Sequence, residues 1–144
     1  MHIKAVNQCV HMVENIEILL SYNNLSTNEI FNILSTNNSL TTLDFIGKIS
    51  SNLSNEICDY VLSEKNKNIL LDNKYLDKND KDNLINFFSA FGKSDLNGQL
   101  NNCKTYKDIF KKSVNKLEKN ENKDCKSIGT IILGLGILLI ILIY

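Results

Sequence analysis

The sequence contains no proline, no tryptophan and no arginine, so all 16 residues counted as lysine plus arginine are lysines. Without arginine the chain has no planar guanidinium group to bind a phosphate through two parallel hydrogen bonds. The 16 acidic residues cancel the lysines, whereas a nucleic-acid-binding domain normally carries net positive charge. We therefore expect no nucleic-acid partner. A length of 144 residues with 43% hydrophobic content suits one folded domain.

Cysteine is scarce and widely spaced, at Cys9, Cys58, Cys103 and Cys125. This spacing matches neither a disulfide scaffold nor a recognisable zinc cluster, and it fits a reducing compartment. We expect these thiols to pack as small apolar side chains. Cys9 and His11 would point to different faces of one helix, so we expect no metal site between them.

Signatures of common enzymes are also missing. The sequence has neither G-x-x-x-x-G-K-[ST] nor G-x-G-x-x-G, which cradle phosphates. The carboxylate pairs Glu14–Glu17 and Asp80–Asp82 lie among lysines and asparagines, a pattern typical of solvated charge. His2 is terminal and is given no role. We expect a non-enzymatic protein with no catalytic residue, no cofactor, no metal and no small-molecule substrate.

What the sequence has instead is apolar residues at steps of three or four, the spacing of one face of a helix. They predict a helix over residues 3–22, stopped by Asn23 and Asn24, with the apolar stripe Val6, Cys9, Val13, Ile16 and Leu20. Ser26 and Glu29 form a capping-box pattern that predicts a short second helix through Leu34.

The helical spacing continues through the middle of the chain at Leu43, Ile46, Ile49, Leu53, Ile57, Tyr60 and Val61. The polar residues 50–55 leave open whether this stretch is one helix or two. Residues 66–82 are rich in Asn, Lys and Asp, so we expect a surface connection there with Tyr75 and Leu76 pointing inward.

Two further helices are predicted on either side of Gly92. The first carries Leu84, Phe87, Phe88 and Phe91 at i, i+3, i+4 and i+7, with Asn79 or Asp80 as its cap. Gly92 suits the left-handed position that follows a helix. The final helix, capped by Ser94 or Asp95, carries the stripe Leu96, Leu100, Cys103, Tyr106, Phe110, Val114 and Leu117. The pattern predicts an all-α fold, an antiparallel bundle of five to six helices.

The final helix continues into an apolar tail. Residues 127–144 carry no charge, and twelve of these 18 are Leu or Ile. As a helix the tail spans about 27 Å, close to the hydrocarbon core of a bilayer. We expect residues 1–126 to form a cytoplasmic bundle and residues 127–144 a transmembrane helix; the alternative is an internal helix of an oligomer. The expected membrane anchor is Ile128, Ile132, Leu135, Leu138, Ile141 and Tyr144. Preceding lysines at Lys119, Lys123 and Lys126 favour a cytoplasmic bundle.

The most distinctive segment lies around Gly92. It reads L-x-x-F-F-x-x-F-G-x-S-D-x-x-G-Q and runs from Leu84 to Gln99. This segment resembles the stage III sporulation protein AB family of endospore-forming bacteria, whose members have an L-G-x-S-D-x-x-G-Q turn between the last two soluble helices. The matching positions are Gly92, Ser94, Asp95, Gly98 and Gln99, while Phe91 replaces the family's Leu and Phe88 stands where Gly is usual.

The resemblance extends in outline from Val6 to Tyr144, and its weaker end is the first helix. Ile16, Glu17 and Tyr22 fit the family's L-E-x-E-I-x-Y stretch. Leu19 and Leu20 stand in place of Glu-Ile, and Ser26 in place of Pro. The family also begins with an apolar membrane segment, which is not seen before Val6. Either the natural chain starts further upstream, which we expect because two anchors and one bundle are the family's usual layout, or this chain is attached to the membrane at one end.

The resemblance implies a non-enzymatic component of the assembly that links mother cell and forespore. Family members resemble the cytoplasmic helical domain of F-type platform proteins of type II secretion. The implied location is the mother-cell membrane facing the forespore, with the bundle on the cytoplasmic side. The implied partners are the membrane and other stage III sporulation proteins, including the secretion-like ATPase stage III sporulation protein AA. The alternative is a generic tail-anchored tether or regulatory protein that pairs through the seam Leu96–Leu117.

Two interpretations of the motif remain open. In the first, Gly92 ends one helix, Ser94 or Asp95 starts the next, and Gly98 lets a neighbouring helix approach. In the second, the segment is a contact site for a partner. Gln99 could return a hydrogen bond to the turn backbone, as a capping-box glutamine does.

Overall fold

The structure is a computed structural model. It describes the backbone of residues 1–22, 25–55 and 63–143, and the side chains of residues 1–22, 25–53 and 63–122. These residues form six helices and no strand, which confirms the predicted all-α fold. The helices are α1 (His2–Tyr22), α2 (Thr27–Ser35), α3 (Phe45–Asn55), α4 (Glu64–Leu71), α5 (Lys78–Ala90) and α6 (Leu96–Ile143).

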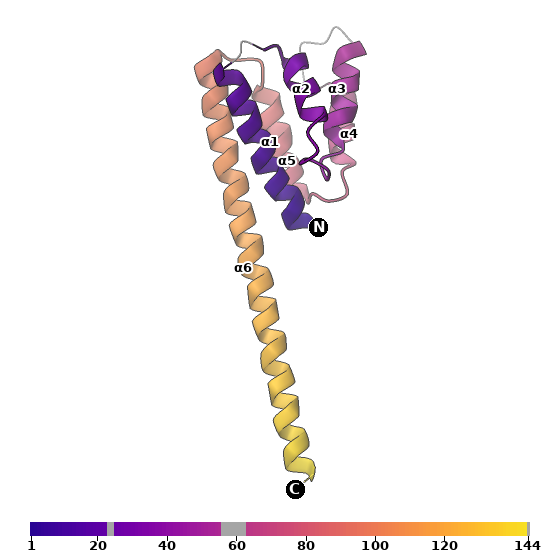
Figure 1. The fold of residues 1–144 in the computed structure, drawn as a ribbon, viewed down its shortest axis with the longest axis vertical. Helices are drawn as coiled ribbons and strands as arrows, with labels where there is room; N and C mark the ends of the chain where they lie inside the picture. Colours follow the sequence, from indigo (N-terminus) through magenta and orange to yellow (C-terminus); the bar gives the residue numbers. More distant parts are fainter. Residues whose placement is uncertain (23–24, 56–62, 144) are drawn as a thin grey trace.

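The helices form two groups (Figure 1), and buried side chains from both groups belong to one hydrophobic core. α1, α5 and α6 lie side by side, with α6 antiparallel to the other two, and the shorter α2, α3 and α4 pack beside them. α1 packs most extensively on α6, which continues well beyond the end of the bundle. At 1.5 Å per residue, the 48 residues of α6 span about 72 Å.

Helix α1 buries more of its surface than a single stripe. All five predicted stripe residues are buried, and Ala5, Gln8, Val10 and Met12 are buried as well. The reason is that α1 lies between α6 on one side and α2 on the other. A helix covered on two sides needs a wider apolar face than a surface helix.

An aromatic cluster joins the two groups of helices. Phe88 on α5 is 1% exposed, and its ring lies 5.6 Å from that of Phe31 on α2 and 6.5 Å from that of Phe45 on α3. Phe87 extends the cluster toward α6, where its ring lies 5.6 Å from that of Tyr106. Phe88 therefore holds α2 and α3 against α5.

The capping box of α2 is confirmed. The Glu29 N–H donates to Ser26 Oγ at 3.4 Å, and the Ser26 N–H donates to Glu29 Oε2 at 2.7 Å. The Ser26 N–H and the Ser26 hydroxyl both donate to Glu29 Oε2, and these two bonds lower the pKa of the Glu29 carboxyl because they stabilise its charged form. α3 continues through residues 50–55, so that polar segment does not end the helix.

The middle of the chain differs from the prediction. Residues 66–82 are not only a connection, because they include most of α4 and the start of α5. α5 is capped by Asp77 rather than by Asn79 or Asp80, since Asp77 Oδ1 accepts from the Asp80 N–H at 2.8 Å. Leu76 is buried as predicted, but Tyr75 is 39% exposed. The predicted stop at Asn23 and Asn24, and the predicted positions Ile57, Tyr60 and Val61, lie outside the described residues.

The stripe on α6 is confirmed except at its first member. Cys103, Phe110 and Val114 are buried against the chain's own helices, whereas Leu96 is 44% exposed. Because the middle of this stripe lies in the bundle core, it cannot serve as the seam of an intermolecular coiled coil while the bundle is folded.

A buried polar side chain ties α1 to the connection between α2 and α3. Gln8 Oε1 accepts hydrogen bonds from the Thr42 backbone N–H at 2.7 Å and from the Thr42 hydroxyl at 2.6 Å. The Thr42 carbonyl in turn accepts from Asn73 Nδ2 at 2.8 Å. Gln8, Thr42 and Asn73 therefore hold α1, the α2–α3 connection and the α4–α5 connection together.

Replacing Gln8 with Leu is expected to lower the free energy of unfolding by about 1–3 kcal/mol, because the buried Thr42 N–H and hydroxyl lose their acceptor. Urea denaturation of the full chain in mild detergent measures this change. Thr41→Val is the control, since Thr41 makes only a 3.3 Å bond to Gln8 Nε2. Equal stability of wild type and Gln8→Leu would show that the network contributes nothing.

Candidate functional site

The predicted motif forms a tight corner between α5 and α6. α5 ends at Ala90, and Phe91 follows in an extended conformation with only 2% of its surface exposed. Gly92 then has a φ of +78°, the left-handed conformation expected of a glycine just after a helix. It is the only residue with positive φ among those described.

Side chains of the motif cap the start of α6. Asp95 Oδ1 accepts a hydrogen bond from the Gly98 N–H at 2.9 Å, so Asp95 rather than Ser94 is the cap. Gln99 Nε2 donates to the Ser94 carbonyl at 3.1 Å, which is the return bond to the turn that the sequence suggested. On the next turn of α6, Asn102 Nδ2 donates to the Phe87 carbonyl at 3.0 Å and so ties α6 to the end of α5.

The role predicted for Gly98 is wrong in one respect. A Cβ atom on Gly98 would lie 2.7 Å from Ser94 Cβ and 3.0 Å from Asp95 Oδ1. The close approach is therefore to the turn of its own corner and not to a neighbouring helix. Gly98 is needed because Ser94 and Asp95 fold back over the first turn of α6.

Gly92→Ala is expected to lower the free energy of unfolding by about 1–2 kcal/mol, because a Cβ atom is strained in the left-handed region. Gly47→Ala is the matched control, since Gly47 lies within α3 and nothing stands within 4 Å of its added Cβ. That control should gain about 0.5–1 kcal/mol from helix propensity. Urea denaturation measures the free energy of unfolding of both variants. If Gly92→Ala is as stable as wild type, a Cβ atom at position 92 causes no backbone strain.

Two ion pairs join α6 to α1. Lys107 Nζ lies 2.5 Å from Glu17 Oε2, and Lys111 Nζ lies 3.0 Å from Glu14 Oε1. The hydrogen bond to Glu17 raises the pKa of Lys107, and the hydrogen bond from Lys111 lowers the pKa of Glu14. The carboxylates Glu14 and Glu17, which the sequence suggested were merely solvated, therefore contact α6.

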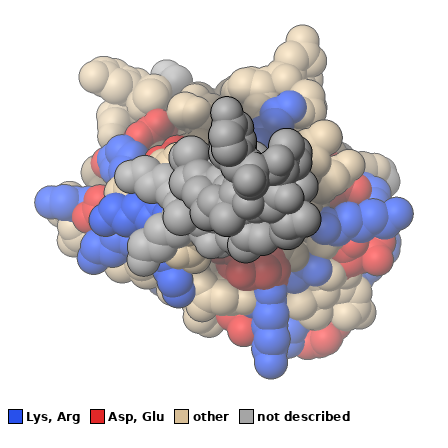
Figure 2. Space-filling model, turned by 90° about the horizontal axis from the view of Figure 1, so that it is seen from below, with Lys and Arg blue, Asp and Glu red and all other residues tan. Residues whose placement is uncertain are grey.

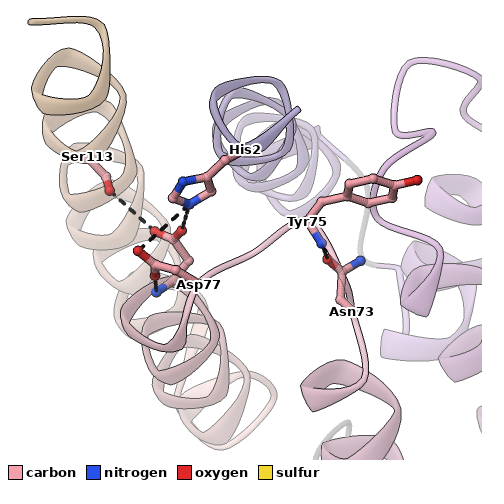
Figure 3. Close-up of polar contacts among 6 residues, drawn as sticks. His2, Asn73, Tyr75, Asp77 and Ser113 are labelled. Atoms are coloured by element: carbon pink, nitrogen blue, oxygen red, sulfur yellow. Dashed lines mark hydrogen bonds and ion pairs between the residues drawn. The ribbon is translucent and has the colours of Figure 1, made fainter. Parts of the chain in front are cut away.

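A polar cluster at the other end of the bundle joins α1, α5 and α6 (Figure 3). His2 Nε2 lies 2.5 Å from Asp80 Oδ2 and 3.8 Å from Asp77 Oδ2. The Ser113 hydroxyl on α6 donates to Asp80 Oδ1 at 3.3 Å. Asp80 is completely buried, and this burial raises its pKa although the His2 hydrogen bond opposes the shift. We call His2, Asp77, Asp80 and Ser113 the three-helix cluster.

Sequence reasoning missed this cluster. It gave the terminal His2 no role and took Asp80 for a surface or capping residue. The available signal was the D-x-x-D spacing of Asp77 and Asp80, which places a helix cap and a carboxylate on the first turn of α5. Nothing in the sequence indicates that His2, 78 positions away, lies against Asp80.

Cys9 and His11 do not form a site. Cys9 is completely buried, and burial raises the pKa of its thiol, while the His11 side chain is 60% exposed beside Glu14. Burial likewise raises the pKa of Cys103 to about 12. Both thiols pack as small apolar groups, as predicted. Cys58 and Cys125 lie outside the residues whose side chains are described.

Lysines and acidic residues alternate around the end of the molecule toward which α6 extends (Figure 2). A hollow of about 450 Å³ on α6 is lined by Lys112, Asn115, Lys116, Lys119 and Asn120. A second hollow of about 450 Å³ lies between α6 and the start of α5, beside Asp77 and Ser113. Both hollows are open to solvent, and polar and apolar atoms line them in similar proportion.

The predicted membrane anchor falls outside the described side chains. Residues 127–143 continue α6, but the side chains of Ile128, Ile132, Leu135, Leu138, Ile141 and Tyr144 are not described. Among the residues that were described, no helix combines the length and apolarity needed to cross a membrane.

The fold and the corner define an all-helical bundle protein whose last helix is tied to the bundle by a capped turn and then extends beyond it. The profile of the family stage III sporulation protein AB matches residues 1–144, and the chain belongs to this family. No curated protein and no solved structure gives a significant match.

Proposed function

We propose that this stage III sporulation protein is a membrane-anchored, non-enzymatic adaptor that holds a helical bundle above the mother-cell membrane for other sporulation proteins to bind. The observation that carries the proposal is the continuity of α6 (Figure 1). One helix starts at the corner, forms one side of the bundle and continues into the apolar tail. If the tail lies in the membrane, a bundle fixed to this helix lies at a defined height above the bilayer.

The apolar tail is the proposed membrane anchor. Its Leu and Ile residues contribute about −4 to −7 kcal/mol toward insertion on the biological scale, taking about −0.3 to −0.6 kcal/mol each. Lys119, Lys123 and Lys126 precede the tail, so the positive-inside tendency favours a cytoplasmic bundle. Under this proposal residues 1–126 are the cytoplasmic domain and residues 127–144 the transmembrane helix.

The contacts of α6 support a rigid connection between bundle and tail. They extend from the Asp95 cap at the corner, through the ion pairs of Lys107 and Lys111, to Ser113 in the three-helix cluster. The first half of α6 is therefore fixed to the bundle, and the unbroken helix carries this orientation toward the tail. A fixed connection of this kind suits an adaptor, which must hold its bundle in a constant orientation for partners to bind.

The end of the bundle farthest from the tail is the proposed docking end. Tyr22, at the end of α1, is 82% exposed, and Leu96, at the start of α6, is 44% exposed. Exposed aromatic residues such as Tyr22 are favoured contact points in protein interfaces, and Leu96 would add apolar area beside it. The proposed partner is the cytoplasmic ATPase stage III sporulation protein AA, which reaches this end without approaching the bilayer.

Binding of purified stage III sporulation protein AA to the full chain in lipid nanodiscs tests the proposal. We expect binding to these nanodiscs and none to empty ones. Tyr22→Ser should weaken binding by about tenfold or more, which corresponds to about 1.4 kcal/mol. The matched control is Tyr75→Ser, since Tyr75 is exposed at a different place in the bundle. Absence of binding would refute the adaptor role with this partner. Equal effects of the two variants would refute the proposed docking end.

A further inference from the structure

Three side chains of the three-helix cluster bring metal-ligand atoms together. His2 is on the first turn of α1, Asp77 caps α5, and Asp80 is on the first turn of α5. One nitrogen of His2 and one oxygen of each carboxylate all lie within 4.8 Å of one another. Figure 3 shows His2 pointing from α1 toward Asp77, with Ser113 approaching from α6.

The carboxylates are already oriented for a ligand. Asp77 Oδ1 accepts from the Asp80 N–H at 2.8 Å, and Asp80 Oδ1 accepts from the Ser113 hydroxyl at 3.3 Å. In each case the other oxygen, Oδ2, faces His2 Nε2. Hydrogen bonds that fix one atom of a side chain and aim the other are the usual outer shell of a metal site.

The charge in the cluster is unbalanced. It holds two carboxylates against one imidazole, and neither Asp77 nor Asp80 pairs with a lysine in the part of the chain that is described. Asp80 is completely buried, and a buried carboxylate is costly unless a positive charge pairs with it or it takes up a proton. A divalent cation would balance both carboxylates at once.

The site is also accessible from solvent. The side chain of Asp77 is 54% exposed and that of His2 is 33% exposed. The open hollow between α5 and α6 is lined by Asp77 and Ser113, and also by Lys112 and Lys116. An ion can therefore reach the cluster without unfolding of the bundle.

We propose that His2, Asp77 and Asp80 bind a divalent transition-metal ion, for which Zn²⁺ is the best match, with water as the fourth ligand. Imidazole nitrogen and carboxylate oxygen are common zinc ligands at about 2.0–2.2 Å. Tetrahedral ligands at that distance are about 3.3 Å apart. His2 Nε2 and Asp80 Oδ2, now 2.5 Å apart, must separate by less than about 1 Å. The bound ion would link the first turn of α1 to the first turn of α5.

The competing explanation is structural. In it, Asp77 is only a helix cap and His2 with Asp80 is only an ion pair. Asp77→Asn separates the two explanations, because asparagine caps a helix about as well as aspartate but loses one carboxylate ligand. The variant should fold normally under either explanation and lose metal binding only if the site is real.

Titration of the chelator-treated full chain in detergent with Zn²⁺, followed by calorimetry, is the test. We expect one ion per chain in wild type and an affinity at least about tenfold lower in Asp77→Asn and in His2→Gln. His11→Gln is the control, because His11 is an exposed histidine beside Glu14 outside the cluster. Its affinity should equal that of wild type.

Titration with Co²⁺ distinguishes the cluster from the four cysteines. Ligation by nitrogen and oxygen gives no thiolate-to-metal charge-transfer band, whereas cysteine ligation gives a strong one. The proposal is overturned if wild type binds no Zn²⁺, if Asp77→Asn binds as tightly as wild type, or if the Co²⁺ complex shows the thiolate band.

Discussion

Phe88→Ala is expected to lower the free energy of unfolding by about 3–5 kcal/mol, the range for a buried phenylalanine truncated to alanine. Phe88 is 1% exposed and its ring contacts those of Phe31, Phe45 and Phe87. Removing the ring leaves a cavity where α2 and α3 meet α5, and the surrounding helices relax only partially into such a cavity. Urea denaturation of the full chain in detergent measures the loss.

The control for Phe88→Ala is Tyr75→Ala, which removes an aromatic ring that is 39% exposed and makes no ring contact in the described structure. Its cost should stay within about 1 kcal/mol. If Phe88→Ala costs no more than this control, the aromatic cluster does not hold the two groups of helices together.

Deleting residues 127–144 is expected to transfer the chain from the membrane fraction to the soluble fraction of the cell. The deleted segment carries the twelve Leu and Ile residues of the tail and no charge, so residues 1–126 expressed alone lack the proposed C-terminal anchor. Fractionation followed by immunoblotting gives the distribution of intact and truncated chains.

A substitution variant guards against misfolding of the truncated chain. Leu135→Lys with Leu138→Lys keeps the full length but costs about 2.5–3.5 kcal/mol per lysine near the centre of a membrane helix. It should partition like the truncated chain, whereas Leu135→Ile with Leu138→Ile should partition like wild type. Recovery of the intact wild-type chain in the soluble fraction would be inconsistent with the anchor.

Local signals in the sequence predicted much of the fold. The stripe of Val6, Cys9 and Val13 gave α1, and the spacing of Ser26 and Glu29 gave the start of α2. Gly92 was identifiable because the left-handed position after a helix has a strong chemical preference. In each case the residues that form the pattern are within about four positions of one another, so the pattern can be recognised in the sequence without the tertiary structure.

Features that depend on distant residues were not predictable. α4 lies in a stretch rich in Asn and Lys, and its only buried residues are Asn66 and Leu70, too few to form a clear apolar stripe. The contact of Gln8 with Thr42 joins residues 34 positions apart, and that of His2 with Asp80 joins residues 78 positions apart. Such polar contacts carry no periodic signature.

The candidate site likewise has parts that the sequence predicts and parts that it does not. The hydrogen bonds of Gln99 and Asp95 join residues at most five positions apart, so they could be predicted. Gly98 was correctly singled out, but the group that excludes its side chain is the Ser94–Asp95 turn, which only the folded backbone brings close.

The height of the corner above the bilayer tests the central claim most directly. Thirty residues of continuous α6 separate position 97 from the start of the tail at 127, which is about 45 Å along the helix, while position 120 is about 10 Å away. Fluorophores attached at Asn97→Cys or Asn120→Cys, with Cys58 and Cys125 replaced by Ser, can report energy transfer to labelled lipid headgroups in vesicles. The account predicts strong transfer from position 120 and weak transfer from position 97. Equal transfer from both positions, or stronger transfer from position 97, would contradict a bundle held above the membrane by α6.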